Sequence, residues 1–264
     1  MELFYSTGTG NSLWAARLLA RELGGARLLS LKHQGKDPPP RDADAVGIVF
    51  PVRMYGVPRP VVEFARGLQA EPSRFIFAVT TNGGEPAGSG QQLERIFAAR
   101  GLVLSAFHSL TLPSSYIPWG GPGSKEEQQR MFSVAEAEIR RIAEAVRERR
   151  LAPPRRHGPL AGRAFRAAVY RLTYPLVPRM DRLFRTDRDC PPCKICEEIC
   201  PARNIEVREC KPVWLHRCEQ CFACLQWCPE KNIQWGRNTA KYERYHHPEV
   251  TLQDMLHQAK ANKG

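Results

Sequence analysis

All nine cysteines of this 264-residue chain lie between positions 190 and 228, and the first 189 residues contain none. Eight of them form two sets with the same spacing, and a proline directly follows each set. The sets are offset by 28 residues: Cys190, Cys193, Cys196 and Cys200 precede Pro201, and Cys218, Cys221, Cys224 and Cys228 precede Pro229. Thiols clustered in this way indicate ligands of a metal centre, because the cysteines of a disulfide scaffold would be spread more widely. The repeat therefore predicts tight, metal-binding loops at this end of the chain.

The spacing of the repeat resembles the cysteine run of bacterial ferredoxins, in which three thiolates bind one [4Fe-4S] cluster and the fourth binds the other. The resemblance implies two ligand sets: Cys190, Cys193, Cys196 and Cys228 for one cluster, and Cys218, Cys221, Cys224 and Cys200 for the other. Structural zinc is the alternative, but zinc leaves the third cysteine of each set and the proline unexplained. Cys210 has no partner at a ligand spacing, so we expect a small buried residue or a hairpin position there.

The two expected clusters differ in their local hydrogen-bond donors. Backbone N–H groups that point at cluster sulfurs raise the reduction potential. Pro191 and Pro192 have no N–H to donate, and Glu197 and Glu198 add negative charge nearby. We therefore expect the cluster held by Cys190 to have the lower reduction potential.

A second site is predicted near the N-terminus, where a hydroxyl-rich turn follows an apolar run at residues 2–5. The turn reads Ser6-Thr7-Gly8-Thr9-Gly10-Asn11-Ser12, and an amphipathic helical pattern begins there. Backbone N–H groups at a helix N-terminus and short hydroxyl side chains bind phosphate. No lysine follows Gly10, which argues against a nucleoside triphosphate loop, and Leu13 stands where a dinucleotide fingerprint has its third glycine. The turn therefore predicts a site for a phosphate monoester.

Residues 1–150 alternate short, β-rich apolar runs with stretches of helical period, which is typical of βαβ units around a parallel sheet. We expect strands at residues 2–5, 26–31, 45–50, 74–80 and 102–110, and helices at residues 12–23, 60–68, 90–100 and 124–150. Five strands with such crossovers predict a doubly wound α/β domain.

The phosphate turn, Thr7-Gly8-Thr9-Gly10-Asn11-Ser12, resembles the loop with which flavodoxins bind the phosphate of FMN, and the five strands agree with the flavodoxin order 2-1-3-4-5. The resemblance implies two further FMN loops, after the third and fourth strands, at the edge where ligands of this fold bind. They supply the remaining candidate contacts: Pro51, Met54, Tyr55, Gly56, Thr81, Asn82, Gly83 and Gly84. By resemblance Tyr55 stacks on the flavin ring and the backbone of residues 82–84 bonds its pyrimidine edge. Ordinary packing of Tyr55 and a plain turn at Gly83-Gly84 are the alternatives.

The chain as a whole resembles fusions of a flavodoxin-like domain with a domain for two [4Fe-4S] clusters. The likeness includes Pro51-Val52, Pro58-Arg59-Pro60, residues 181–189 and Arg244-Tyr245-His246-His247-Pro248. It implies a flavodoxin-like, doubly wound five-stranded parallel sheet followed by a small α+β ferredoxin-like domain. The expected parts are an FMN domain (1–150), a basic amphipathic connector (151–186), a cluster domain (187–236) and a C-terminal tail (237–264).

The expected cofactors, FMN and two [4Fe-4S] clusters, predict a function in electron transfer. A flavin accepts two electrons and can release them singly, whereas each cluster carries one, so the combination converts two-electron into one-electron transfer for a partner redox enzyme. No catalytic acid, base or nucleophile is evident, although Arg53 would stabilise a reduced, anionic flavin. Two alternatives remain open. One is a flavin-dependent reductase of a small substrate, with residues 113–120 lining its pocket, and the other is a cluster-containing nucleic-acid-binding or sensor module.

Charge is distributed unevenly along the chain. Lys and Arg number 39 against 27 Asp and Glu, a formal net charge of +12, and residues 151–188 hold nine arginines and no lysine. Apolar residues interleave with these arginines as in a basic amphipathic helix interrupted by Pro175 and Pro178. We expect this arginine-rich segment to bind an acidic redox protein or to pack against the chain's own domains. A membrane surface ranks next. No nucleic acid is expected, because no nucleic-acid-binding motif accompanies the charge.

Hydropathy predicts a cytoplasmic, globular protein. The chain is 42% hydrophobic and 25% charged, which excludes a wholly disordered polypeptide. No stretch approaches the roughly 18 uncharged apolar residues of a membrane-spanning helix. The first residues, Met1-Glu2-Leu3-Phe4-Tyr5, also lack the basic and apolar run of a signal peptide.

Overall fold

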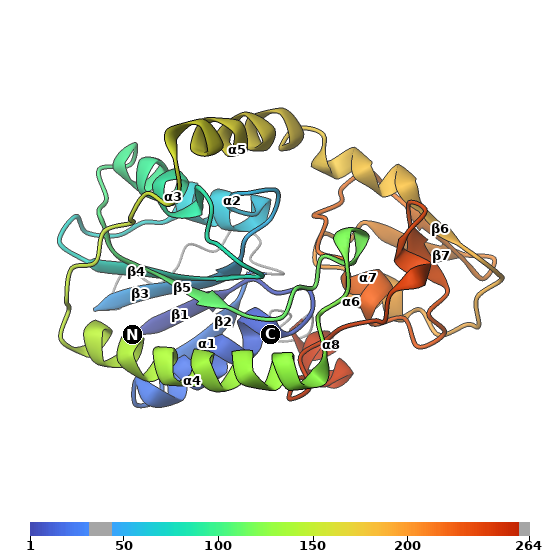
Figure 1. Ribbon diagram of the computed structural model, residues 1–264, viewed down its shortest axis with the longest axis horizontal. Helices are drawn as coiled ribbons and strands as arrows, with labels where there is room; N and C mark the ends of the chain where they lie inside the picture. Colours follow the sequence, from blue (N-terminus) through green and yellow to red (C-terminus); the bar gives the residue numbers. More distant parts are fainter. Residues whose placement is uncertain (32–43, 259–264) are drawn as a thin grey trace.

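The computed structural model describes residues 1–31 and 44–258, and a five-stranded parallel sheet forms the N-terminal half (Figure 1). The strand order is β2-β1-β3-β4-β5, which confirms the predicted order 2-1-3-4-5 and the flavodoxin-like topology. The strands are β1 (Glu2–Tyr5), β2 (Arg27–Ser30), β3 (Ala45–Pro51), β4 (Phe75–Asn82) and β5 (Leu104–Thr111). The strand order therefore reverses between β1 and β3, and this fold class binds ligands at that point.

Helices cover both faces of the sheet, which explains why β3 and β4 are almost continuously apolar. On one face lie α1 (Asn11–Glu22) and α4 (Lys125–Arg147), and on the other lie α2 (Arg59–Gly67) and α3 (Ser89–Ala98). Alternate residues of each strand enter the two cores, as Leu3 and Phe4 of β1 do. Gly47 permits this packing, because a Cβ there would lie 2.3 Å from the ring of Phe77.

The predicted elements are present, with ends shifted by one to three residues. β4 extends to Asn82, two residues beyond its predicted end, because the polar pair Thr81-Asn82 continues the ladder with β5. The predicted helix at 124–150 ends at Arg147. It begins at Lys125, one residue after the predicted start, because Ser124 is its cap and accepts a hydrogen bond from the Glu127 backbone N–H.

The basic connector forms a helix, α5 (Leu160–Thr173), followed by a 3-10 segment, η2 (Val177–Leu183). The two are separated close to Pro175 and Pro178, as the sequence predicted. The inner side of α5 packs on the sheet domain through the Tyr170 hydroxyl, which donates to the Val57 carbonyl at 2.9 Å. An ion pair between Arg166 and Glu85, at 2.9 Å, lies beside it.

The cysteine-rich part is small and built from short elements. Two antiparallel strand pairs join β6 (Phe184–Thr186) to β9 (Ile233–Trp235) and β7 (Ile205–Arg208) to β8 (Lys211–Trp214). Two short helices, α6 (Ile195–Ile199) and α7 (Ala223–Gln226), begin within the two cysteine sets. Cys210 lies in the turn between β7 and β8 with φ 58° and is exposed. Of the two alternatives expected for Cys210, the hairpin position is therefore confirmed, and the buried position is not.

A buried carboxylate anchors the connector to the cysteine-rich part. Asp181 of η2 is 1% exposed and accepts a hydrogen bond from the His216 backbone N–H at 2.8 Å and from the Asn204 amide at 3.0 Å. The imidazole Nδ1 of His216 lies 2.7 Å from the other Asp181 oxygen. These bonds satisfy the carboxylate, which would otherwise be costly to bury, and they fix the loop that leads to Cys218.

The C-terminal segment returns to the sheet domain. It contains η3 (Thr239–Lys241) and α8 (Leu252–His257), and residues 259–264 of the predicted tail lie outside the described residues. Val250 and Met255 are buried in the core beneath α1, and Asp254 pairs with Arg17 of α1 at 2.5 Å. Within the described ranges no helix is both long and apolar enough to cross a membrane.

We expect Asp181→Ala to lower the melting temperature of the purified protein by several degrees, because it leaves the buried Asn204 amide without its acceptor and removes the bond from the His216 backbone N–H, at a cost of about 3 kcal/mol. The matched control is Asp187→Ala, which removes an exposed carboxylate paired only with Arg185 and should cost less than about 0.5 kcal/mol. Calorimetry of the two variants makes the comparison. Equal melting temperatures would contradict an anchoring role for Asp181.

Candidate functional site

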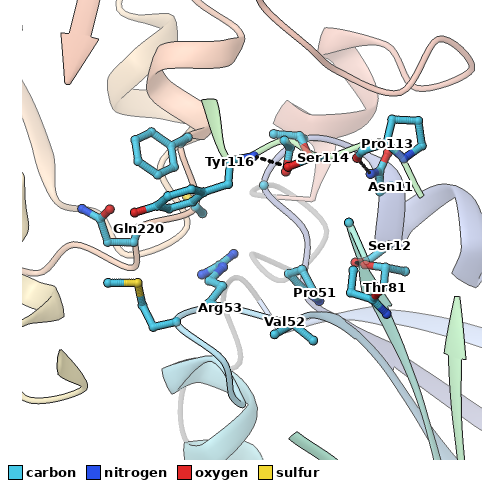
Figure 2. A pocket seen from close by; sticks show the side chains of 18 of the residues that line it. Asn11, Ser12, Pro51, Val52, Arg53, Thr81, Pro113, Ser114, Tyr116 and Gln220 are labelled. Carbon is cyan, nitrogen blue, oxygen red and sulfur yellow. Dashed lines mark hydrogen bonds between the residues drawn. The ribbon is translucent and has the colours of Figure 1, made fainter. Parts of the chain in front are cut away.

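A cavity of about 310 Å³ lies at the carboxyl ends of the strands, beside the cysteine-rich part (Figure 2). Its walls come from the loops after β1, β3, β4 and β5 and from the loop between Cys218 and Cys224. Twelve of the fifteen predicted FMN residues line it: Thr7, Gly8, Thr9, Asn11, Ser12, Pro51, Met54, Tyr55, Thr81, Asn82, Gly83 and Gly84. The other three, Ser6, Gly10 and Gly56, lie in the same loops without lining the cavity.

The phosphate turn is shaped by its own hydroxyl groups. Gly10 has φ 98° and donates its N–H to the Thr7 hydroxyl at 3.1 Å, so the chain turns sharply into the first residue of α1. The hydroxyls of Ser12 and Thr81 lie 2.8 Å apart, and the Asn11 amide donates to the Pro113 carbonyl at 3.0 Å (Figure 2). The turn thus places the N-terminal end of α1, with its positive dipole end, at the cavity.

Residues of the C-terminal half hold the phosphate turn in place by hydrogen bonds. The Trp227 indole N–H donates to the Gly8 carbonyl at 3.1 Å, and the His247 backbone N–H donates to the Thr9 carbonyl at 2.9 Å. The Tyr245 hydroxyl lies 2.6 Å from the Asn11 amide oxygen. Because a trans peptide points its N–H opposite to its carbonyl, the bond from Trp227 directs the Thr9 N–H away from the indole.

The turn also lies directly against a loop of the cysteine repeat. A Cβ added at Gly8 would lie 2.5 Å from the Cys221 carbonyl oxygen and 2.9 Å from the Cys221 Cβ. Only glycine fits so close an approach of two backbones. Gly8 therefore serves the contact between the two halves as well as the shape of the turn.

His246 and His247, two of the histidines of the tail, are packing residues. His247 is fully buried, stacks on Trp14 with ring centroids 4.6 Å apart, and accepts a hydrogen bond from the Glu249 N–H at its Nδ1. Burial lowers the pKa of His247 to about 3, so the ring is neutral. His246 stacks on Trp227 at 4.2 Å. Both rings fix the tail against the turn.

Aromatic side chains border the part of the cavity expected to hold the flavin ring. Met54 and Tyr55 occupy the two central positions of a tight turn, with φ 47° and 65°, closed by hydrogen bonds between Arg53 and Gly56. The ring centroids of Tyr55 and Trp119 lie 6.4 Å apart, and those of Trp119 and Tyr116 lie 4.8 Å apart. Left-handed conformations of non-glycine residues cost about 1–3 kcal/mol and gather at binding sites.

The loop after β4 exposes its backbone to the cavity. The Asn82 side chain is satisfied internally, because its amide group donates to Ser109 and Leu110 and its oxygen accepts from the Gly84 N–H at 3.0 Å. Asn82 therefore shapes this loop, and a ligand would meet mainly its backbone groups.

Arg53 joins the loop after β3 to the cysteine repeat. Its guanidinium lines the cavity, donates to the Glu219 carbonyl at 2.9 Å and lies 3.8 Å from the Glu219 carboxylate. Arg59 approaches the same carboxylate at 4.0 Å. Burial raises the pKa of Glu219 to about 7, although both arginines act in the opposite direction.

The eight repeated cysteines surround two further cavities. The first is bordered by Cys190, Cys193, Cys196 and Cys228, and the second by Cys200, Cys218, Cys221 and Cys224. These are the same two groups of four that the resemblance implies as ligand sets, and their role as ligands stays a prediction. Burial raises the pKa of Cys196 to about 12, and that of Cys224 well above its usual value, so both thiols must release protons to bind metal. Within the described residues, no three His, Cys, Asp or Glu side chains are placed to hold a single metal ion.

The two cysteine loops repeat their backbone conformation as well as their spacing. Lys194 and Phe222, 28 residues apart, are both left-handed, with φ 50° and 56°, and cap α6 and α7. The symmetry fails at Gln220, whose N–H donates to the Cys218 sulfur at 3.3 Å. Pro192 is its counterpart and has no N–H. The Asn232 amide donates to the Cys190 sulfur at 3.2 Å instead.

Sequence reasoning missed several residues of the site. Gln220 and Phe222 line the cavity, and Trp227 braces the phosphate turn, yet none carries a motif of its own. They lie in or beside the cysteine repeat, which we interpreted only as a metal site. Tyr116 and Trp119 belong to the loop that the reductase alternative placed at the pocket, and they do line it.

Comparison with known proteins gives only distant likenesses. No protein-family model and no curated protein matches the chain. A candidate flavoprotein from Bacteroides uniformis is 15% identical over 50% of this chain and 96% of its own, with a TM-score of 0.34. An archaeal flavodoxin is 10% identical over 54% of this chain and 96% of its own, with a TM-score of 0.32. The flavodiiron core of Synechocystis Flv1 is 12% identical over 56% of this chain and 36% of its own, with a TM-score of 0.37. At such scores the likeness adds nothing to the fold, which rests on the strand order itself.

We expect Trp227→Phe to weaken FMN binding about tenfold, because it keeps an aromatic ring against His246 but removes the donor that orients the Gly8 peptide. The matched control is Trp235→Phe, which removes an equivalent indole bond, to the Met180 carbonyl, away from the phosphate turn. Titration of flavin-free protein with FMN, followed by the fluorescence of the flavin, measures the dissociation constant of each variant. Equal affinities in the two variants would show that the bond from Trp227 does not position the turn.

Proposed function

We propose that this protein transfers electrons between FMN and two [4Fe-4S] clusters, and so converts two-electron into one-electron transfer for a partner redox enzyme. The flavin would supply two-electron exchange, and each cluster would carry one electron. The observation that carries the proposal is the place of Cys221 and Phe222. Both residues line the cavity at the sheet edge and also border the second cysteine cavity. The expected flavin site and one expected cluster site therefore share a wall.

The cavity at the sheet edge fits FMN in its chemistry. Its phosphate end offers the hydroxyls of Thr7, Thr9 and Ser12 and the start of α1, which bind a phosphate without a lysine. Its other end offers Tyr55 and Trp119 as apolar surfaces for a planar ring.

The two cysteine cavities fit the proposed clusters in their ligands and donors. Four thiols surround each cavity, as one thiolate at each iron of a cubane cluster requires. The sulfurs of Cys200 and Cys218 receive backbone N–H bonds, from Asn204 and Gln220, both at 3.3 Å. Such donors stabilise negative charge on sulfur and tune a cluster potential.

The burial of the thiols suggests an order for the three sites. Cys221 adjoins the flavin cavity and Cys193 of the other set is exposed. Between them, Cys224 is buried and lies close enough to Cys196 of the other set for charges on the two sulfurs to interact. Electrons would then pass from the flavin to the cluster in the cavity bordered by Cys221, next to the cluster in the cavity bordered by Cys193, and from there to the protein surface. We propose that the partner redox enzyme exchanges electrons near Cys193. The missing N–H at Pro192 favours a lower potential for this outer cluster, although the bond from Asn232 offsets part of that effect.

A reductase of a small substrate is the second candidate, and the loop of residues 113–120 favours it. Ser114, Ser115, Tyr116 and Trp119 line the cavity, and Trp119 is 72% exposed at its rim. A small molecule could enter beside this side chain. Turnover of a low-molecular-weight acceptor whose KM rises in Trp119→Ala, with electron transfer to the clusters unchanged, would favour the reductase.

The decisive experiment compares Cys221→Ser with Cys210→Ser after anaerobic purification. We expect Cys221→Ser to lose the iron of one cluster, while the exposed hairpin cysteine is replaced without effect. Light-driven reduction of the flavin, followed by the EPR signals of reduced clusters, then measures electron transfer. We expect the transfer rate to fall at least about tenfold in Cys221→Ser.

Two outcomes would overturn the proposal. One is a wild-type protein purified anaerobically that contains no flavin or no iron. The other is identical iron content and transfer rate in the two cysteine variants, since the expected ligand would then be no different from a surface thiol.

A further inference from the structure

The connector carries an unusual share of the exposed apolar side chains. Twelve large apolar residues are exposed in the described chain, and five lie within residues 160–183: Leu160, Phe165, Leu172, Leu176 and Leu183. None of the residues of α5 is buried. A helix that exposes its apolar residues has a face without a partner.

That face points away from the rest of the protein. Ala161, Phe165, Ala168 and Leu172 recur at intervals of four and three residues, so they form one stripe along α5. The opposite side is occupied by Tyr170, which bonds the Val57 carbonyl. Figure 1 shows α5 along the outer edge of the molecule, above α2 and α3 and leading into the C-terminal half.

Unpaired arginines accompany the exposed apolar residues along the connector. Of the nine arginines in residues 151–188, three have acidic partners: Arg166 with Glu85, Arg185 with Asp187, and Arg188 with Glu230. The other six have none within the described parts of the chain: Arg155, Arg156, Arg163, Arg171, Arg179 and Arg182. Asp181, the one acid of residues 160–186, is buried and turned inward. The outer surface of the connector therefore carries both exposed apolar side chains and unpaired positive charges.

We propose that α5 and η2 form a docking surface for the face of an anionic lipid bilayer. Basic amphipathic helices with Phe and Leu on one face bind such surfaces in the plane of the headgroups. A bilayer accepts the apolar stripe and pairs the arginines with lipid phosphates at the same time. An acidic protein would satisfy only the arginines, and a second copy of this chain would bring six unpaired arginines against six others. The proposal is independent of the cofactors.

Vesicle co-sedimentation of the full-length, cofactor-loaded protein tests the surface. We expect binding to vesicles of phosphatidylglycerol mixed with phosphatidylcholine and little binding to phosphatidylcholine alone. The double change Phe165→Asp and Leu172→Asp should weaken partitioning by about tenfold or more. The double change Arg171→Gln and Arg179→Gln should weaken it about fivefold for each arginine removed.

Matched controls come from α4, on the opposite side of the molecule (Figure 1). Val134→Asp replaces an apolar residue that is 70% exposed, close to the 64% of Phe165, and Arg130→Gln removes an exposed arginine. Both controls should bind vesicles as the wild type does. Because all substituted residues are exposed or at the surface, far-ultraviolet circular dichroism should be unchanged in every variant.

Three results would overturn the proposal. The first is no preference of the wild type for anionic vesicles. The second is binding that depends on the arginines but not on Phe165 and Leu172, which would indicate an acidic protein partner. The third is a dimer in sedimentation velocity that Phe165→Asp with Leu172→Asp dissociates, which would identify a second copy as the occupant of the stripe.

Discussion

The close approach of Gly8 to Cys221 is the contact on which the arrangement of the molecule depends. With no side chain between them, the phosphate turn and the cysteine loop are nearly in backbone contact. The same packing makes Cys221 and Phe222 part of two cavities at once. Around it, Arg53 and Trp227 tie the loops of the sheet to the cysteine-rich part by hydrogen bonds. The distance between the two kinds of site is thereby set by packing rather than by the length of a linker.

Apolar burial extends this contact over a larger area. One continuous core contains Leu3 of the sheet and Trp14 of α1 together with Ile199, Trp227 and Met255 from the C-terminal half. Its residues come from the sheet, from α1 and α4 and from the C-terminal half, and none comes from α5 or η2. The connector is instead held by polar anchors, Tyr170 at one end and Asp181 at the other. Its outer face remains free of the intramolecular packing that fixes its inner face.

The sequence predicted what depends on local pattern. The strands, helices, strand order and turn residues followed from periodicity, from Gly8 and Gly10, and from the resemblance that these residues carry. The residues that it did not predict act through contacts between distant segments. Trp227 and the Gly8 carbonyl are 219 positions apart, and no spacing rule relates them. For Cys210 the hairpin was predictable from the turn position, but its exposure depends on how the hairpin lies on the rest of the fold. The cysteines that border each of the two cavities match the sets implied by the ferredoxin resemblance, and their binding of clusters stays a prediction.

The bracing of the phosphate turn has a consequence for the order of assembly. The turn is synthesised well before its supports, because Gly8 precedes Trp227 by 219 positions and Tyr245 and His247 follow later still. A nascent sheet domain thus has the turn without the bonds that orient it, and the turn is fully braced only after His247 has been synthesised. The two halves are therefore poor candidates for separation by truncation or for exchange as modules. The segment that carries Tyr245 and His247 therefore couples completion of the phosphate turn to synthesis of the cysteine-rich part that precedes it.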